Sequence, residues 1–261
     1  MHLIFRTKEF LKYMLSADNE HAIHSPFVYD LYTNIILDRS SYYAFEKIES
    51  VRAKMILSDE KIPVLDYGTG GEEKSQRLLK ISYIARHYVK PQKDGQLLFR
   101  LINYFHPGSI LEMGTSLGIT TLFLAAPVSK SKVVTIEGCP NTSAVARKNF
   151  ERAGVKNIVL ETGEFNKSLP LALAHFEKLD FVYFDGNHRK QATLQYFNQC
   201  LELHHTGSVF VFDDIHWSSE MLEAWDEIRN HPLVTISIDL YRVGIIFFRE
   251  TQPKQHFRLR F

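Results

Sequence analysis

The chain has 261 residues, of which 45% are hydrophobic, and its 31 basic and 30 acidic side chains leave a formal net charge of +1. A chain of this length and composition can bury a large core, which excludes a disordered protein. The nearly neutral charge excludes a general electrostatic attraction for nucleic acid and favours a small or neutral substrate.

Two features point to a reducing, cytoplasmic environment. The N-terminal stretch MHLIFRTKEFLKYML is interrupted by charged residues, so it lacks the apolar centre of a signal peptide and is too short to cross a bilayer. We expect an amphipathic helix there and no membrane partner. The two cysteines, Cys139 and Cys200, cannot form a disulfide framework.

The first part of the chain, residues 1–107, is predicted to be a helical N-terminal region. Apolar residues recur there at helical spacing, as at Phe27, Leu31 and Ile35 and again over residues 78–85. The region is also rich in aromatic residues. They could cover the site and form the acceptor pocket, where excluding water favours methyl transfer, or they could simply pack as core.

From residue 108 to residue 261, short β-rich runs alternate with helical segments. Five runs follow one another at intervals of about 21 to 28 residues. This rhythm predicts βαβ units and a parallel sheet, because parallel neighbours need a crossover helix. The runs are SILEMG (109–114), KVVTIEG (132–138), NIVLETG (157–163), LDFVYFDG (179–186) and GSVFVFDD (207–214).

Two further runs, VTISIDLY (234–241) and GIIFFR (244–249), are separated by only two residues. So short a link predicts an antiparallel hairpin that closes one edge of the sheet. The predicted fold is therefore α/β, with a doubly wound, Rossmann-like sheet of seven mostly parallel strands and a helical N-terminal extension. A ligand is expected at the carboxyl ends of the strands.

Two stretches, VLDYGTGG (64–71) and ILEMGTSLG (110–118), look like a strand that runs into a glycine turn. A cofactor turn needs a following helix and then a second strand whose acid binds the ribose hydroxyls. The second stretch meets this requirement, because Glu137 stands nineteen residues after Gly118 at the tip of a β-rich run. VLDYGTGG has no such sequel and is expected to be a loop between helices; its contact with ligand stays open.

The glycine spacing also bears on the identity of the cofactor. Dinucleotide-binding turns use G-x-G-x-x-G so that backbone amides approach a pyrophosphate, whereas three residues separate Gly114 from Gly118 here. Glu112 precedes the first glycine by two residues, and an acid there repels phosphate and attracts a cation. These features favour S-adenosylmethionine, which carries a sulfonium and no phosphate, with Glu137 as the ribose acceptor.

The motifs ILEMGTSLG, VVTIEG, FVYFDGNHR and SVFVFDDIHW together resemble class I S-adenosylmethionine-dependent methyltransferases, in the O-methyltransferase-like branch related to catechol and caffeoyl-CoA methyltransferases. The resemblance covers about residues 108–249 and implies cofactor contacts in the first motif, at the ribose acid Glu137 and, near the adenine, at Glu164. For Glu164, an acid at a helix N-terminus is an equally simple interpretation. The matching first-motif residues are Glu112, Gly114, Thr115, Ser116 and Gly118.

Asp185 ends the fourth predicted strand, where the resemblance implies a carboxylate beside the transferred methyl group that often binds magnesium. Related metal-dependent enzymes have a lysine base three residues later, but this chain has His188 there. Methyl transfer is an in-line displacement in which the acceptor oxygen loses a proton, and an imidazole of pKa about 6.5 suits that task. We expect Asp185 and His188 to be catalytic; otherwise His188 is only a polar loop residue.

Asp213 and Asp214 end the fifth predicted strand, where metal-dependent relatives carry Asp-Asn. With Asp185 they would form three converging carboxylates, which suit Mg²⁺ or Ca²⁺ and would repel one another without a cation. A divalent metal bound by Asp185, Asp213 and Asp214 is therefore predicted. The competing arrangement has no metal and uses Asp213 to orient a histidine; His188 and His216 could also favour a softer metal.

The leading functional hypothesis is O-methylation of a small-molecule acceptor, with a homodimer as one possible assembly. The alternatives are a catalytically silent cofactor-binding module that acts through a protein partner and a methyltransferase of macromolecules. An amino-methylating DNA enzyme is disfavoured because DGNH (185–188) replaces the Asn/Asp-Pro-Pro-Tyr/Phe motif of such enzymes, and no nucleic-acid partner is expected. A nicotinamide-dependent oxidoreductase is disfavoured because G-x-G-x-x-G is absent.

Overall fold

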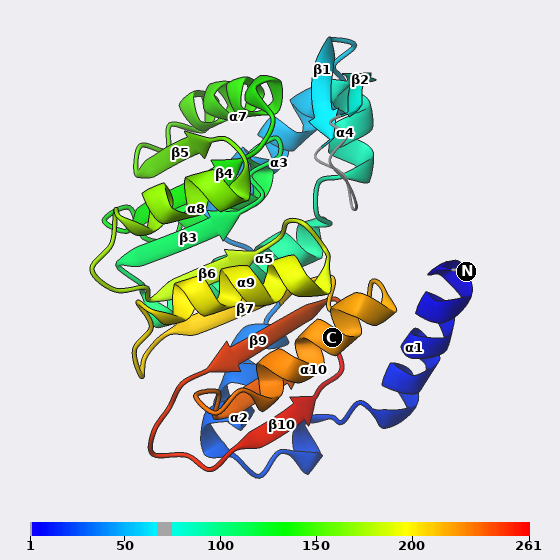
Figure 1. The fold of residues 1–261 in the computed structure, drawn as a ribbon, viewed down its shortest axis with the longest axis vertical. Coiled ribbons are helices and arrows are strands. Elements are labelled where there is room, and N and C mark those ends of the chain that lie inside the picture. The colour runs from blue at the N-terminus through cyan, green and yellow to red at the C-terminus, as the bar shows by residue number, and fades with distance from the viewer. Residues whose placement is uncertain (1, 67–74) are drawn as a thin grey trace. The chain divides into compact units, whose positions relative to one another are not determined.

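The computed structural model describes residues 2–66 and 75–261 (Figure 1). The chain forms two compact units. The terminal unit contains Met1–Asp38 and Glu177–Phe261, and the central unit contains Arg39–Phe176. These two units do not coincide with the boundary expected at residue 107. That boundary separates regions of different expected function, and it stays a prediction.

The central unit contains three parallel strands in the order β3, β4, β5. Every residue of β3 is buried, as is typical of a parallel strand covered on both faces. Helices connect consecutive strands, which confirms the predicted βαβ units. The elements are β3 (Ser109–Met113), α6 (Ile119–Ala125), β4 (Lys132–Glu137), α7 (Pro140–Ala153), β5 (Ile158–Thr162) and α8 (Phe165–Leu173).

Three more helices precede these strands, and aromatic packing joins two of them to the βαβ core. Phe45 and Phe99 lie with ring centroids 4.9 Å apart, and both belong to the hydrophobic cluster that contains Phe123 and Phe150. This packing supports the interpretation of these aromatics as core. The helices are α3 (Tyr43–Ile56), α4 (Ile81–His87) and α5 (Gln92–Phe105).

A β-hairpin lies between α3 and α4, where only helices and a loop were expected. Strand β1 (Lys61–Asp66) pairs antiparallel with β2 (Ser75–Lys80), and α4 begins only at Ile81. The loop expected at VLDYGTGG is therefore wrong for its first three residues, which end β1; residues 67–71 lie outside the described residues. The helical spacing over residues 78–85 is correct only from Ile81 onward.

The terminal unit contains five strands in the order β10, β8, β9, β7, β6. The parallel pair β6–β7 and the antiparallel hairpin β8–β9 are confirmed. β10 pairs parallel with β8 and takes the edge that the hairpin was expected to close, so it is a strand beyond the seven predicted. The strands are β6 (Phe181–Phe184), β7 (Val209–Asp213), β8 (Ile236–Asp239), β9 (Val243–Phe247) and β10 (Gln255–Arg258).

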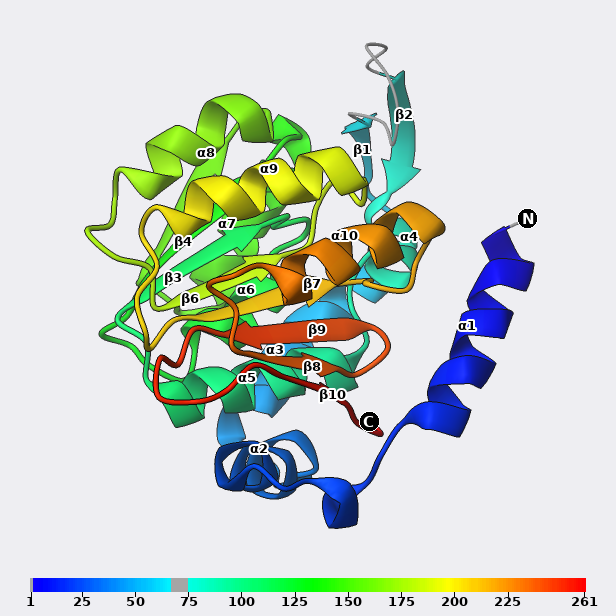
Figure 2. The same ribbon diagram turned by 60° about the horizontal axis from the view of Figure 1, so that its bottom comes forward.

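Helices α9 (Lys190–Leu201) and α10 (Ser219–Asn230) lie side by side over one face of these strands (Figures 1 and 2). The N-terminal segment is joined to the C-terminal one by hydrogen bonds, among them Tyr32 Oη to the carbonyl oxygen of Arg260 at 2.8 Å. None of the helices in the described ranges is long and apolar enough to span a membrane. The segment forms α1 (His2–Ser16), η1 (Glu20–Ala22), α2 (Pro26–Leu31) and η2 (Tyr32–Ile36).

Candidate active site

The predicted cofactor turn joins β3 to α6 in the central unit. The backbone N–H groups of Gly114 and Thr115 donate to the carbonyl oxygen of Ile136 at 3.0 and 3.2 Å, which ties the turn to β4. Gly118 has φ of 81°, in the left-handed region that glycine adopts without strain. A Cβ at Gly118 would also lie 2.5 Å from Phe150 Cε1. Backbone conformation and packing therefore both require glycine at the start of α6.

Glu112 lies on β3 and is fully buried. Its Oε2 accepts hydrogen bonds from the hydroxyls of Thr121 and Thr135, the latter at 2.7 Å. Burial raises the pKa of Glu112 to about 7, although these two hydrogen bonds act in the opposite direction. The Thr135 hydroxyl also contacts the hydroxyl of Thr115. Glu112 is thus linked to the turn through Thr135 and Thr115, and its direct contact with a cofactor stays a prediction.

Glu137 ends β4 and is partly buried. The backbone N–H of Ser116 donates to its Oε2 at 2.8 Å, and the backbone N–H of Cys139 donates to its Oε1 at 2.9 Å. Burial raises the pKa of Glu137, against the effect of these backbone donors. The donors fix the carboxylate and leave lone pairs for hydroxyl donors. This geometry suits a ribose acid better than it suits a solvated surface glutamate.

Glu164 stands at the N-terminus of α8, where its carbonyl oxygen accepts from the N–H groups of Lys167 and Ser168 at 2.9 Å. Its carboxylate lies 3.9 Å from Lys167 Nζ. These contacts are those of an ordinary acid at a helix N-terminus, which the helix dipole stabilises. A role of Glu164 near the adenine stays a prediction.

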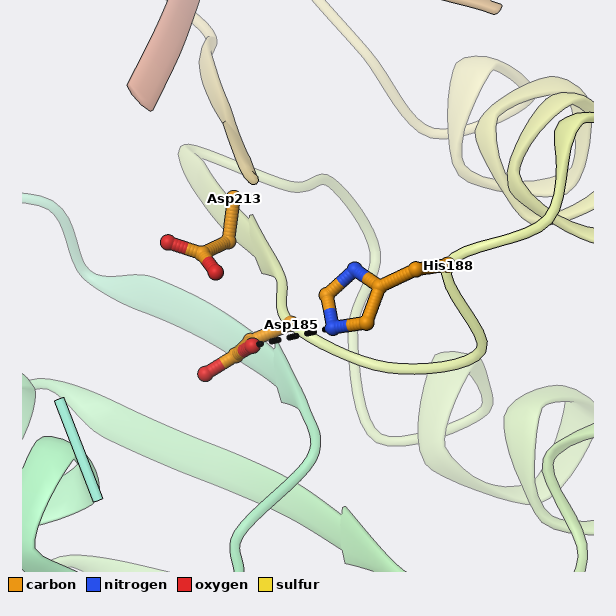
Figure 3. Close-up of side chains that lie close together, drawn as sticks. All are labelled: Asp185, His188 and Asp213. Atoms are coloured by element: carbon orange, nitrogen blue, oxygen red, sulfur yellow. Dashed lines mark ion pairs between the residues drawn. The ribbon is translucent and has the colours of Figure 1, made fainter. Parts of the chain in front are cut away.

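Three predicted catalytic and metal-binding residues come together in the terminal unit (Figure 3). Asp185 follows β6, His188 lies in the loop that leads to α9, and Asp213 ends β7. Because β6 and β7 are parallel, their carboxyl ends lie at the same edge. One ligand atom from each residue lies within 4.8 Å of the others, and His188 Nε2 is 3.8 Å from Asp185 Oδ1. Asp213 is buried, whereas the other two are partly exposed.

Asp214 does not belong to this cluster, although the sequence predicted it as the third metal ligand. Among the described residues, the group that could hold an ion consists of Asp185, His188 and Asp213. Asp214 lies beyond the last residue of β7, and its backbone turns into the left-handed region with φ of 51°. The expected set of three carboxylates is thus replaced by two carboxylates and an imidazole.

His216, the other candidate histidine, pairs with Asp239, an aspartate that was not among the predicted site residues. Its Nε2 lies 2.9 Å from Asp239 Oδ2, both residues are buried, and the imidazole stacks on the Tyr241 ring. Burial raises the pKa of Asp239, but His216 and Arg258 outweigh burial, so the net shift is downward. The sequence signal that could have identified Asp239 is its position at the end of a strand, β8. The histidine near Asp213 is therefore His188, not His216.

Comparison with known proteins gives a consistent family. A model of the O-methyltransferase family matches residues 76–242. The catechol O-methyltransferase of Niastella koreensis is 31% identical over 149 residues, which cover 56% of this chain and 65% of that protein. The catechol O-methyltransferase of Mycobacterium tuberculosis is 32% identical over 126 residues, which cover 47% of this chain and 55% of that protein. The chain thus spans between about half and two thirds of these relatives.

Solved structures confirm the fold. The O-methyltransferase from Bacillus cereus in complex with SAH has a TM-score of 0.57 at 21% identity, and the match covers 84% of this chain and 97% of that one. This likeness confirms the α/β, Rossmann-like class with a mostly parallel sheet, and the family match confirms the resemblance in the four sequence motifs. Because the family model matches more than half of its residues, the chain belongs to the O-methyltransferase family.

Proposed function

We propose that this protein is an S-adenosylmethionine-dependent methyltransferase that methylates a hydroxyl group of a small molecule. The observation that carries the proposal is the cluster of Asp185, His188 and Asp213 at the carboxyl ends of two parallel strands in a chain of this family. The two relatives named catechol O-methyltransferase support an acceptor with neighbouring hydroxyl groups. A cytoplasmic location and a homodimer stay predictions.

The cofactor is assigned to the glycine turn and the acids around it. Glu137 supports this assignment, because its carboxylate is held by backbone donors, among them Ser116 and Cys139, and can accept from the ribose hydroxyls. The backbone N–H of Ser116 in the turn already donates a hydrogen bond to that carboxylate, so it does not provide a donor for a phosphate. The proposed cofactor-binding residues are Glu112, Gly114, Thr115, Ser116, Gly118, Glu137, Glu164 and Asp185.

His188 is assigned as the general base. When bound, S-adenosylmethionine would supply the methyl group to the acceptor oxygen and keep the carbon–sulfur electron pair on sulfur, and the acceptor proton would pass to His188 Nε2. Asp185, 3.8 Å away, stabilises the imidazolium that forms. A positioned base of this kind contributes about 10²- to 10⁴-fold in rate.

The same cluster also fits a divalent metal ion. Two carboxylates and an imidazole suit Mn²⁺ or Fe²⁺ better than Mg²⁺, which prefers oxygen ligands alone. Such an ion, held by Asp185, His188 and Asp213, would supply positive charge that lowers the pKa of an acceptor hydroxyl. His188 would then be a ligand instead of a base.

Transfer of labelled methyl groups from S-adenosylmethionine to catechol tests the proposal, with Mg²⁺, Mn²⁺ or EDTA present. We expect His188→Gln and Asp213→Asn to lose at least about 100-fold in turnover and to retain affinity for S-adenosylhomocysteine, whereas Asp214→Asn, the matched control, keeps its turnover. Activity that survives EDTA identifies His188 as the base, and activity that only Mn²⁺ restores identifies it as a ligand. Cofactor binding without turnover on any hydroxylated acceptor would favour the silent module and refute the proposal.

A further inference from the structure

The β1–β2 hairpin packs against the cofactor turn within the central unit. A two-stranded hairpin is marginally stable by itself in water, so it needs support. Here Ile62 of β1 is buried in a hydrophobic cluster that also contains Leu117 of the turn and Val145 of α7. Val64 and Leu79 pack against the same cluster. The hairpin and the turn therefore share one core.

Polar groups that follow β4 bind the outer edge of β1. The carbonyl oxygen of Pro63 and the N–H of Leu65 face the same side of the strand, because residues two apart present their backbone groups alike. Asn141 Nδ2 donates to the Pro63 oxygen at 2.7 Å, and the Leu65 N–H donates to Cys139 Sγ at 3.4 Å. These contacts satisfy a strand edge that β2 does not cover.

Cys139 connects this edge with the proposed ribose acid. Its side chain accepts from Leu65, and its backbone N–H donates to Glu137 Oε1 at 2.9 Å. Cys139 is buried, so it has little freedom to move at one contact without moving at the other. A displacement of β1 would therefore shift one of the backbone donors that fix the Glu137 carboxylate.

We propose that the β1–β2 hairpin is a positioning element for ribose recognition, and that Asn141 and Cys139 are the positioning residues that couple it to Glu137. The inference rests on the proposed function, since it takes Glu137 as the ribose acid. Strand β1 precedes residues 76–242, which the family model matches, whereas β2 lies inside that range from residue 76 onward. A hairpin with a purely structural role would stabilise the unit and leave ligand discrimination unchanged.

Calorimetric titration of the full chain tests this coupling with two ligands, S-adenosylhomocysteine and its 2′,3′-dideoxy analogue. We expect Asn141→Ala to weaken binding of S-adenosylhomocysteine about three- to tenfold, the effect of one hydrogen bond, and to leave binding of the analogue unchanged. Cys139→Ala should show the same ligand dependence and serves if Asn141→Ala does not fold. Asn157→Ala is the matched control, because its amide also anchors backbone, donating to Ser131 at 3.1 Å, but lies away from Glu137. It should lower the melting temperature with no change in affinity.

Three results would overturn the inference. Unchanged affinity for S-adenosylhomocysteine in both the Asn141 and Cys139 variants would show that the hairpin is not coupled to Glu137. An equal loss for both ligands would show a general structural effect. If the wild-type chain binds neither ligand, the proposed function fails and the inference fails with it, whereas the first two results leave the proposed function intact.

Discussion

Replacing Glu112 by glutamine is expected to change how stability depends on pH. Burial raises the pKa of this fully buried carboxyl from its ordinary 4.5 to about 7. Because the folded state holds the proton more tightly than the unfolded chain, this group stabilises the fold fully below pH 4.5, and that stability is lost as the pH rises to about 7. At about 1.4 kcal/mol for each pH unit, the interval from 4.5 to about 7 corresponds to about 3 kcal/mol.

Glutamine still accepts from Thr121 and Thr135 but cannot ionise. Its amide nitrogen would take the place of Oε1, which accepts no hydrogen bond from the described residues, at a cost of about 1–3 kcal/mol at any pH. Urea unfolding should therefore show Glu112→Gln less stable than wild type at pH 4.5 and gaining about 3 kcal/mol on wild type by pH 8. Glu151→Gln, an exposed position on α7, is the control with a constant difference. Parallel pH profiles for wild type and Glu112→Gln would refute a desolvated carboxyl.

Two further substitutions test the packing around the site. Gly118→Ala should cost about 2–4 kcal/mol of unfolding free energy, because it combines a left-handed φ with a clash at Phe150. Gly154→Ala is also left-handed but lacks that clash, so it should cost about 1 kcal/mol. Equal losses in urea unfolding would mean that the Phe150 ring moves aside freely. Asp239→Asn should cost about 1.5–3 kcal/mol at pH 7, since it removes the charged acceptor that lies 2.9 Å from His216 Nε2. The net pKa of Asp239 is lowered, so its contribution is present above its ordinary pKa of 3.8 and lost as the pH falls below that value, and an undiminished difference in unfolding at pH 3 would contradict this pairing.

The regular part of the fold could be predicted because its pattern is local. The run SILEMG predicts a buried parallel strand, and β3 covers Ser109–Met113. β2 could not be predicted in this way, since SQRLLK places two leucines side by side, as a helix also can. The strand depends on tertiary contacts, because Leu79 packs against a cluster that includes Leu117 and Val145, which lie far away in the sequence. β10 was not predicted, because its four residues are too few to show a clear alternation of apolar and polar side chains.

In the candidate site, the positions of the residues along the chain could be predicted, but the directions of their side chains could not. Acids at strand ends, such as Asp185 and Asp213, could be predicted to meet because parallel strands end at one edge. The adjacency of Asp213 and Asp214 suggested two ligands, but β7 ends at Asp213, the backbone turns at Asp214, and His188 is the third member of the cluster. The burial of Glu112 under two threonines also depends on packing between strands and could not be seen in the sequence.

These contacts change the physical reason for which the turn should reject a pyrophosphate. The negative charge of Glu112 would repel a phosphate, but with a pKa of about 7 that carboxyl is neutral in about half of the molecules at neutral pH. A phosphate at the turn would need backbone N–H donors, and the Ser116 N–H already donates to Glu137 at 2.8 Å. A pyrophosphate would have to displace that carboxylate from its donor, whereas a ribose can donate to it where it stands. We therefore propose that the fixed position of the Glu137 carboxylate, more than the charge of Glu112, disfavours dinucleotides.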